Sequence, residues 1–354
     1  MRARRGEDGA RPAKRPAARR ALRFATRLAC SRGLAAAAWL VLALAAAVAL
    51  GRAIAPSSSE LLVELAALNA VAFVPVWPVL LLGVATRRLA LAGAGAALVV
   101  AQVAYAAPEV LAARPVPRWA SAAPHIRLLD ANVGADGGRT DVAGFARQIR
   151  SVSPDVVLLE EATPGQVATL VGDGALAALR FRYEVRGLAP WGFAVASRFR
   201  LRVVGTSWRG GEPYLVRLVL SLPGGPLRLW MVHAASPALS VADWRTELTG
   251  VAGLVRSLGS GRLVIAGDFN ASWGNPPFAG IVARGLADAA AARGDPFAMT
   301  WPEGLVVPPL VRIDHVLVGP GLSVPAISTG NGPGSDHRDL VATLAVAPRP
   351  LSVR

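Results

Sequence analysis

The chain has 354 residues, enough for more than one domain, and its apolar fraction of 53% exceeds the range of about 45–50% that is usual in soluble domains. Cys30 is the only cysteine, which excludes an intramolecular disulfide and a metal cluster held by several thiolates. The formal net charge is +15, and Lys14 is the only lysine, so nearly all of the positive charge is Arg. A balance this basic is typical of proteins that bind nucleic acid or an anionic membrane surface.

The positive charge is concentrated in the first third of the chain. Residues 1–123 carry 16 Lys and Arg against 5 Asp and Glu, whereas residues 124–354 carry 22 against 18. Residues 1–32 are rich in Arg, Ala and Pro, which predicts a disordered cationic tail. Most of the charge therefore lies before the part of the chain that carries the candidate catalytic residues.

Three uncharged runs follow the tail, at residues 33–51, 65–85 and 89–108, with 19, 21 and 20 residues. Each is long enough to cross a hydrocarbon core of about 30 Å as a helix. A cleaved signal peptide is the alternative for the first run, and a buried helix of a soluble protein is the alternative for any of them. Three such runs so close together favour a membrane region of three transmembrane helices over residues 33–108.

The placement of Arg predicts the orientation of these helices. Eleven basic residues precede the first run, Arg87 and Arg88 form the turn between the second and third, and only Arg52 lies between the first two. Because basic loops stay in the cytoplasm, we expect the N-terminus and the Arg87–Arg88 turn there. An odd number of crossings then puts everything after residue 108 outside the cytoplasm, after a linker over residues 109–123.

From His125 onward, short apolar strands alternate with amphipathic segments. We expect strands at residues 126–133, 155–161, 193–198, 214–222, 227–234, 263–266, 312–318 and 339–346. We expect helices at residues 141–151, 166–179, 241–258 and 281–292. This mixture predicts an α/β domain over residues 124–346, with its sheet buried under helices, and a short tail over residues 347–354.

The stretch LVIAGDFN at residues 263–270 carries the clearest chemistry. Gly267 allows a tight turn after the buried strand, and Asp268 and Asn270 are then two positions apart, on one face of an extended backbone. The carboxylate can bind a cation or orient a water molecule, and the amide can donate hydrogen bonds to an anion. An Asx turn without chemistry is the alternative.

Other polar residues stand at the ends of neighbouring strands or in a loop near the C-terminus: Asn132, Glu160, Glu161, His233, Asp314, Asp336 and His337. Each has an ordinary structural explanation when it is taken alone. Together they contain the groups that metal-assisted phosphoester hydrolysis needs. Carboxylates bind a hard cation such as Mg²⁺, Asn and protonated His stabilise phosphoryl oxygens, and a His–Asp pair supplies an oriented base.

The order and wording of these segments resemble the endonuclease/exonuclease/phosphatase superfamily over residues 124–346. The segments are NV at 132–133, PDVVLLEE at 154–161, HAASP at 233–237, GDFN at 267–270, RIDHVLV at 312–318 and SDH at 335–337. The resemblance implies two packed β-sheets flanked by helices, a four-layer sandwich. It also implies Mg²⁺ as cofactor, with Mn²⁺ as a substitute.

The resemblance also implies a role for each matching residue. Those implied near the metal are Asn132, Glu161 and Asp336. In catalysis, Asp268 is implied to orient the attacking water and Asn270 to bind the scissile phosphate. His337 is implied as base or phosphate stabiliser, with Asp314 fixing its ring. His233 is implied as general acid.

The sequence departs from the family pattern at three places. The block at 159–161 reads LEE where the family has LQE, and we expect Glu160 to point away from Glu161 because neighbouring strand residues face opposite ways. His315 stands where the family often has Tyr, and we interpret it as structural. The carboxylate that partners the second His in deoxyribonuclease-like members has no clear match.

We therefore expect a membrane-anchored, Mg²⁺-dependent phosphoester hydrolase of phosphodiesterase or nuclease type, acting on nucleic acid or phospholipid outside the cytoplasmic membrane. A phospholipid-directed phosphodiesterase or phosphatase is one alternative, and a catalytically inactive binding module of the same fold is another. The Arg residues at 180, 182, 186, 198, 200 and 202 could line a nucleic-acid groove or form a solvated face.

Overall fold

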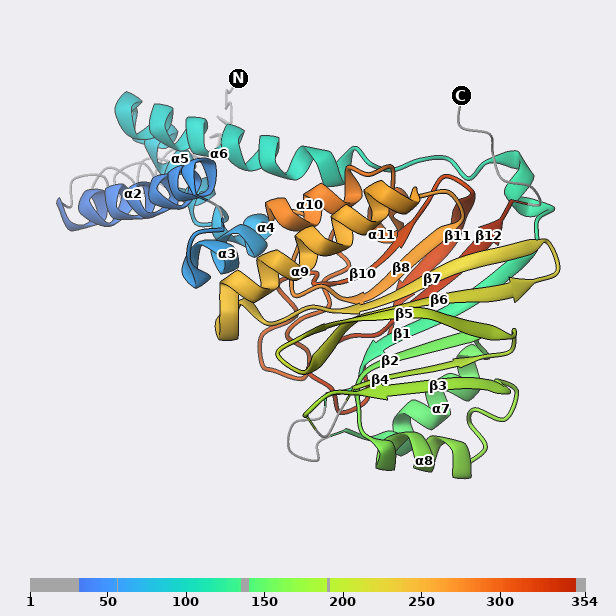
Figure 1. Ribbon diagram of the computed structural model, residues 1–354. Helices are drawn as coiled ribbons and strands as arrows, with labels where there is room; N and C mark the ends of the chain where they lie inside the picture. Colours follow the sequence, from blue (N-terminus) through green and yellow to red (C-terminus); the bar gives the residue numbers. More distant parts are fainter. Residues whose placement is uncertain (1–31, 56, 135–139, 190–191, 348–354) are drawn as a thin grey trace, which may run out of the picture. The chain divides into compact units, whose positions relative to one another are not determined.

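The structure is a computed structural model that describes residues 32–55, 57–134, 140–189 and 192–347 (Figure 1). The expected cationic tail lies outside the described residues except for Arg32, and so does nearly all of the expected C-terminal tail. Contacts divide the chain into two units: residues up to 49 together with 73–101, and residues 50–72 together with 102–354.

Two helices of the described residues are long and apolar enough to cross a membrane, over Gly33–Ile54 and Leu89–Val110. They belong to α2 (Arg32–Ile54) and α6 (Leu89–Val110). The expected third span at residues 65–85 is not one continuous helix. This part of the chain forms α3 (Glu60–Ala67), α4 (Asn69–Ala72) and the ten-residue apolar helix α5 (Val76–Ala85). Pro75 caps α5 and Pro78 lies in its first turn, where the missing N–H groups are tolerated, so a new helix starts there.

The second unit contains two six-stranded mixed sheets. The first has the order β11-β12-β1-β2-β4-β3, and the second has the order β5-β6-β7-β8-β10-β9. The strands of the first sheet are β1 (His125–Asn132), β2 (Val156–Ala162), β3 (Phe181–Arg186), β4 (Gly192–Ser197), β11 (Leu322–Thr329) and β12 (Leu340–Val346). Those of the second are β5 (Leu201–Arg209), β6 (Glu212–Leu222), β7 (Gly225–His233), β8 (Leu263–Asp268), β9 (Ala287–Asp288) and β10 (Asp314–Val318).

Helices cover the outer faces of the two sheets, so the unit has four layers (Figure 1). The apolar core between the sheets includes Leu128, Leu158, Leu218 and Val264. The helices α7 (Val142–Val152) and α8 (Pro164–Gly172) pack on the first sheet. The helices α9 (Pro237–Leu258) and α10 (Pro276–Val282) pack on the second. The expected sandwich of two sheets flanked by helices is confirmed.

Two expected helices differ from the structure. The helix expected at residues 281–292 is wrong, because the chain there forms the end of α10, the short strand β9 and α11 (Ala289–Ala292). The break falls at Gly285, whose φ of +85° is a left-handed conformation that suits glycine. The helix expected at 166–179 ends early, at Gly172. A short 3₁₀ helix, η1 (Arg118–Ser121), precedes β1.

The helix α3 is part of the core of the second unit. Val63 and Ala66 are each 1% exposed, and Val63 belongs to the apolar cluster between α9 and the second sheet. The side chain of Asn275 donates a hydrogen bond to the Val63 carbonyl at 2.9 Å, and the Ser272 hydroxyl donates to the Ala67 carbonyl at 3.3 Å. The chain between the two long apolar helices thus contributes a structural element to the sandwich.

A buried ionic cluster joins the end of α6 to the same unit. Arg312 is 1% exposed, pairs with Glu109 and lies 3.5 Å from an oxygen of Asp288. Asp288 also contacts Nδ1 of His315 at 2.6 Å, and Nε2 of that ring lies 2.9 Å from the Ala271 carbonyl. Burial raises the pKa of Asp288, but Arg312 and His315 outweigh it and hold the pKa below its ordinary value. Both ring nitrogens of His315 are engaged in this cluster, which fits a structural role.

Candidate active site

Strand pairing in the two sheets brings the candidate residues to one edge of the sandwich. His233 of β7 is the register partner of Asp268 of β8, because these two strands are parallel. Asp314 of β10 is the antiparallel partner of Asp268 on its other side. Asn132 and Glu161 come from the ends of β1 and β2 in the facing sheet. Five side chains that are far apart in the sequence therefore meet.

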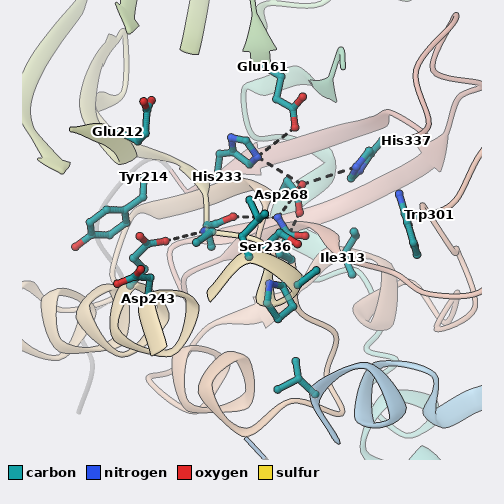
Figure 2. Close-up of a pocket in the computed structure, with 18 of the residues that line it drawn as sticks. Glu161, Glu212, Tyr214, His233, Ser236, Asp243, Asp268, Trp301, Ile313 and His337 are labelled. Carbon is teal, nitrogen blue, oxygen red and sulfur yellow. Dashed lines mark hydrogen bonds and ion pairs between the residues drawn. The ribbon is translucent and has the colours of Figure 1, made fainter. Parts of the chain in front are cut away.

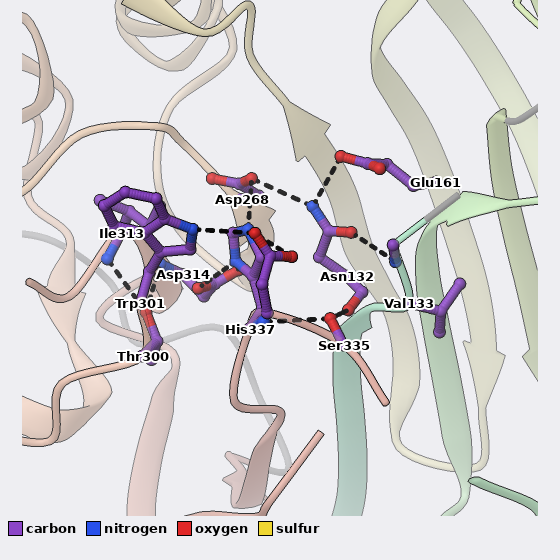
Figure 3. A network of polar contacts seen from close by, with 12 residues as sticks. Asn132, Val133, Glu161, Asp268, Thr300, Trp301, Ile313, Asp314, Ser335 and His337 are labelled. Atoms are coloured by element: carbon purple, nitrogen blue, oxygen red, sulfur yellow. Dashed lines mark hydrogen bonds and ion pairs between the residues drawn. The ribbon is translucent and has the colours of Figure 1, made fainter. Parts of the chain in front are cut away.

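The amide of Asn132 connects the two sheets (Figure 3). Its nitrogen donates to an oxygen of Glu161 at 3.1 Å and to an oxygen of Asp268 at 3.2 Å. Its own oxygen accepts from the backbone N–H of Gly134 at 3.0 Å. The amide is thus fixed by both of its ends, and it holds two carboxylates at the same place.

The backbone at Glu161 is irregular, and this corrects the expectation for Glu160. The pairing of β2 with β4 shifts between Leu159 and Ala162, and Glu161 has a φ of +53°. The resulting bulge turns Glu161 toward Asn132, while Glu160 is fully buried on the same inter-sheet side as Asp130. Side chains do not alternate strictly between the two faces of β2 here, because a bulge places two residues of one strand opposite one residue of its partner strand. Burial, joined by the neighbouring carboxylates, raises the pKa of both Asp130 and Glu160 well above the usual range.

The turn after β8 holds Asp268 and Asn270 in fixed positions. A Cβ on Gly267 would lie 2.0 Å from the Val232 carbonyl oxygen, and the φ of Gly267 is +131°, so only glycine fits. The backbone N–H of Asn270 donates to Asp268 at 2.7 Å, and the Asn270 side chain donates to the Ala234 carbonyl at 2.9 Å. The indole of Trp244 donates to the Asn270 carbonyl at 3.0 Å. Burial, aided by Asp314, raises the pKa of Asp268 to about 6.

His337 is oriented through both its ring and its backbone. Its Nδ1 lies 3.0 Å from Asp314, and its backbone N–H donates to the Ser335 hydroxyl at 3.0 Å, which in turn donates to the Asn132 carbonyl at 2.7 Å. Its Nε2 lies 3.9 Å from Asp268. Burial alone would lower the pKa of His337, but Asp314 and Asp268 outweigh it and raise the pKa to about 10.

His233 lies on the other side of Asp268 (Figure 2). Its Nε2 is 3.4 Å from an oxygen of Glu161 and 3.9 Å from an oxygen of Asp268. Burial lowers the pKa of His233, but the hydrogen bond with Glu161 and the charge of Asp268 outweigh it, so the pKa is raised. The carboxylate nearest to this ring is Glu161, which the resemblance places near the metal.

Asp336 stands apart from the other residues expected near the metal. Its side chain is 62% exposed, with one oxygen 4.0 Å from Nε2 of His337 and the other accepting from the Trp301 indole at 3.1 Å. It therefore lies beside the cluster. The other seven expected residues lie together around Asp268: Asn132, Glu161, His233, Asp268 itself, Asn270, Asp314 and His337.

Sequence reasoning missed several supporting residues. Ser335 ties the His337 loop to β1, and its place in the SDH segment was a usable signal. The Thr300 hydroxyl accepts from the backbone N–H groups of Ile313 and Asp314 at 3.1 and 3.3 Å, and so fixes the start of β10. Trp244 and Thr300 lie outside the motifs, and no local pattern marks them.

The site lies in a cavity of about 940 Å³ (Figure 2). Glu161, His233, Asp268 and His337 line one part of it. Residues of α3, of the β5–β6 hairpin, of the first half of α9 and of the segment 301–313 line most of the rest. The cavity is thus much larger than the polar cluster alone requires.

The donor set fits a hard divalent cation. Asp268, Asp314 and His337 offer ligand atoms that all lie within 4.8 Å of one another, and this group could bind a metal ion. Glu161 adds a third carboxylate next to Asp268, linked to it by the Asn132 amide. Carboxylate and amide oxygens are ligands that Mg²⁺ accepts, and the concentration of buried negative charge favours a cation.

The family model of the endonuclease/exonuclease/phosphatase family matches residues 131–337, which is more than half of the chain. The chain belongs to this family. Its members generally hydrolyse phosphoester bonds and depend on a divalent metal. No curated protein matches the sequence.

Solved structures show the same fold. An endonuclease/exonuclease/phosphatase from Beutenbergia cavernae DSM 12333 is 22% identical with a TM-score of 0.51, over 63% of this chain and 72% of that one. D. rerio TDP2 complexed with a single-strand DNA product is 18% identical with a TM-score of 0.52, over 63% and 99%. A humanized D. rerio TDP2 is 16% identical with a TM-score of 0.53, over 63% of this chain and 99% of that one. At these identities the likeness concerns the fold alone.

Proposed function

We propose that this protein is a membrane-anchored, Mg²⁺-dependent hydrolase of phosphoester bonds, of the phosphodiesterase type. The observation that carries the proposal is the convergence of Glu161, Asp268 and His337 at one cavity, where the Asn132 amide hydrogen-bonds to both carboxylates. Their partners Asn270, Asp314 and His233 complete a set with an acid, a base and anion-binding groups.

Asp268 and His337 would act on the two reactants. The Asp268 carboxylate, held by the Asn270 N–H, can orient the attacking water and accept a hydrogen bond from it. With its pKa raised to about 10, His337 is an imidazolium at neutral pH and can stabilise the phosphoryl oxygens. Asn270 can donate to the scissile phosphate, and His233 can protonate the leaving oxygen.

Glu161 would hold the metal ion, with Asp336 as an outer carboxylate. Asn132 would join it through its amide oxygen, which requires the amide to turn, because its nitrogen is the atom that faces Glu161 and Asp268. The ion would neutralise negative charge on the phosphate. Asp268, Asp314 and His337 are an alternative ligand set, although the hydrogen bond between Asp314 and His337 would then have to be replaced.

Membrane anchoring rests on the two long apolar helices together with two contacts of the second unit. Residues 55–59 connect α2 to α3, which packs in the core of that unit, and Glu109 near the end of α6 pairs with buried Arg312. The last residues of α2, from 50, and of α6, from 102, belong to the second unit. If both helices cross the membrane, residues 69–88 must cross back between them, which makes three crossings. With the basic N-terminus in the cytoplasm, the catalytic unit is then extracytoplasmic.

The test compares the full chain with its Asp268→Asn, His337→Ala and double variants on bis(4-nitrophenyl) phosphate, with Mg²⁺ or EDTA. Positioned acid–base groups contribute about 10²–10⁴-fold, so each single change should lower kcat by that much. The double variant should be little worse than the poorer single one, because the two residues act as a unit.

His125→Ala is the matched control, because His125 of β1 is exposed. This variant should leave kcat unchanged. Folded Asp268 and His337 variants that keep near-full kcat would remove these residues from the mechanism. A folded wild type without activity on any phosphoester would instead favour a binding module. Circular dichroism checks folding in each case.

A further inference from the structure

Apolar side chains line one wall of the cavity, where Glu64 of α3 is the charged neighbour. The apolar residues that line it are Val63 of α3, Leu68 directly after α3, Leu239 at the start of α9, and Leu310 and Ile313 of the segment before β10. Figure 2 shows Ile313 on the side of the cavity away from Glu161. A phosphate bound near Asp268 and His337 would therefore have apolar surface beside it.

The charge of the cavity does not suit a polyanion. Among the described residues that line it, Arg209 is the only basic side chain besides two histidines, and seven carboxylates accompany it. Arg209 already lies 3.3 Å from both Asp243 and Glu247. A nucleic-acid strand is held mainly by several Lys and Arg on successive phosphates. The six Arg residues between 180 and 202 are not among the lining residues.

The apolar wall is open at its rim. Leu239 is 87% exposed and follows the catalytic strand β7 by only a few residues, at the point where Ser240 leaves helical geometry. Trp301, which also lines the cavity, is 39% exposed. Exposed large apolar side chains next to a polar site are typical of a ligand-binding surface.

We propose that the cavity binds an amphiphilic phosphoester, with the phosphate at Asp268 and His337 and a long alkyl chain along the wall formed by α3 and the start of α9. This inference rests on the proposed hydrolase function and names its substrate class. The candidate membrane helix α2 ends at Ile54, six positions before α3, so the element that forms this wall is tethered closely to a segment suited to lipid.

The reaction needs no reactant other than the phosphoester and water. Water attacks phosphorus, the bond between phosphorus and the leaving oxygen breaks, and the proton from water ends on the leaving oxygen or in solvent. Both products keep the oxidation states of the reactants.

The experiment uses the full chain in nanodiscs and two diesters that share one chromogenic leaving group, methyl 4-nitrophenyl phosphate and dodecyl 4-nitrophenyl phosphate. Each buried methylene favours binding by roughly fourfold in the limit of full burial. We expect the dodecyl ester to exceed the methyl ester in kcat/KM by at least about 10². Leu239→Glu should reduce this ratio about tenfold or more.

Leu258→Glu is the matched control, because Leu258 is an exposed leucine at the other end of α9 and is not among the lining residues. It should leave both rates unchanged. Partition of the dodecyl ester into the nanodisc is the same for all variants, so the difference between the two substitutions reports on the cavity.

Equal kcat/KM for the two esters, or an equal ratio in the Leu239→Glu and Leu258→Glu variants, would overturn the inference and leave the hydrolase function standing. Preference for a 12-residue single-stranded oligonucleotide would overturn it as well. If neither ester is hydrolysed, the proposed function fails. Binding of dodecyl phosphonate and methyl phosphonate, measured by calorimetry, then decides the inference separately, and equal affinities would refute it.

Discussion

Glu160 and Glu161 have different surroundings although they are neighbours. Glu160 is fully buried between the sheets beside Asp130, whereas the Glu161 side chain is 21% exposed and contacts Asn132 and His233. The left-handed φ of Glu161 separates the two roles: one glutamate is enclosed by the core and the other faces the cavity.

We predict that Glu161→Ala raises the Mg²⁺ concentration for half-maximal activity by at least about tenfold, as loss of groups around a metal commonly does. Glu160→Gln should leave this concentration nearly unchanged, because it keeps the shape of a side chain that does not line the cavity. The measurement is initial rate against Mg²⁺ for both variants. If Glu160→Gln raises the Mg²⁺ requirement and Glu161→Ala does not, then Glu160 and not Glu161 is the glutamate at the metal.

A second prediction concerns His337 in metal-free protein. Its pKa of about 10 in the folded state lies above the ordinary value of about 6.5, so the imidazolium stabilises the fold fully below about pH 6.5. That contribution is lost as the pH rises through 10. The free energy of unfolding in EDTA should therefore fall between pH 6.5 and 10, and Asp314→Asn should flatten the fall.

Urea unfolding at a series of pH values measures this effect. His125→Ala serves as the control, because the exposed His125 lies away from Asp314 and should leave the slope as it is. The explanation fails if the Asp314→Asn protein loses stability over this range as steeply as the wild type.

At the scale of elements, α3 and the segment before α10 fit together at the backbone. A Cβ added at Gly274 would lie 2.1 Å from the Ala66 carbonyl oxygen, and this contact involves backbone that cannot swing away. The hydrogen bonds of Ser272 and Asn275 to α3 flank this contact. The packing of α3 thus depends on one glycine.

We predict that Gly274→Ala lowers the Tm by roughly 5 °C or more, since overpacking costs about 1–3 kcal/mol. Gly280→Ala is the matched control, because Gly280 lies in α10 with nothing within 4 Å of an added Cβ. It should leave the Tm unchanged or raise it slightly, as alanine favours helices. Thermal unfolding followed by circular dichroism compares the two, and equal Tm values would show that α3 can move without cost.

At the scale of the whole molecule, the number of membrane crossings decides where the catalytic unit lies. Three crossings predict that alkaline phosphatase fused after Arg354 is active and that the same reporter inserted between Arg87 and Arg88 is silent. A cytoplasmic reporter at each position is the control and should give the opposite pattern. An active cytoplasmic reporter after Arg354 in a well-expressed fusion would reverse the orientation.

The strand and helix patterns predicted an α/β domain with its sheet under helices, whereas the two-sheet sandwich and the grouping of the seven residues followed from the resemblance to the family. The sequence failed at Glu160, because a bulge is a property of strand pairing and leaves no mark in the local pattern. It also did not show that the run at residues 65–85 is divided among the end of α3, α4 and α5, because apolar composition is the same in one long helix and in several short ones. Trp244 and Thr300 were missed because their contacts join distant parts of the chain.

The position of α3 also determines where a recombinant fragment of this protein can begin. A fragment starting at residue 102 would keep both sheets but lose Val63 and Ala66, so the apolar surface that they cover on the second sheet and α9 would face water. Such a fragment should aggregate on expression. A synthetic peptide of residues 57–72 supplied in trans should rescue its solubility, because it carries the missing face.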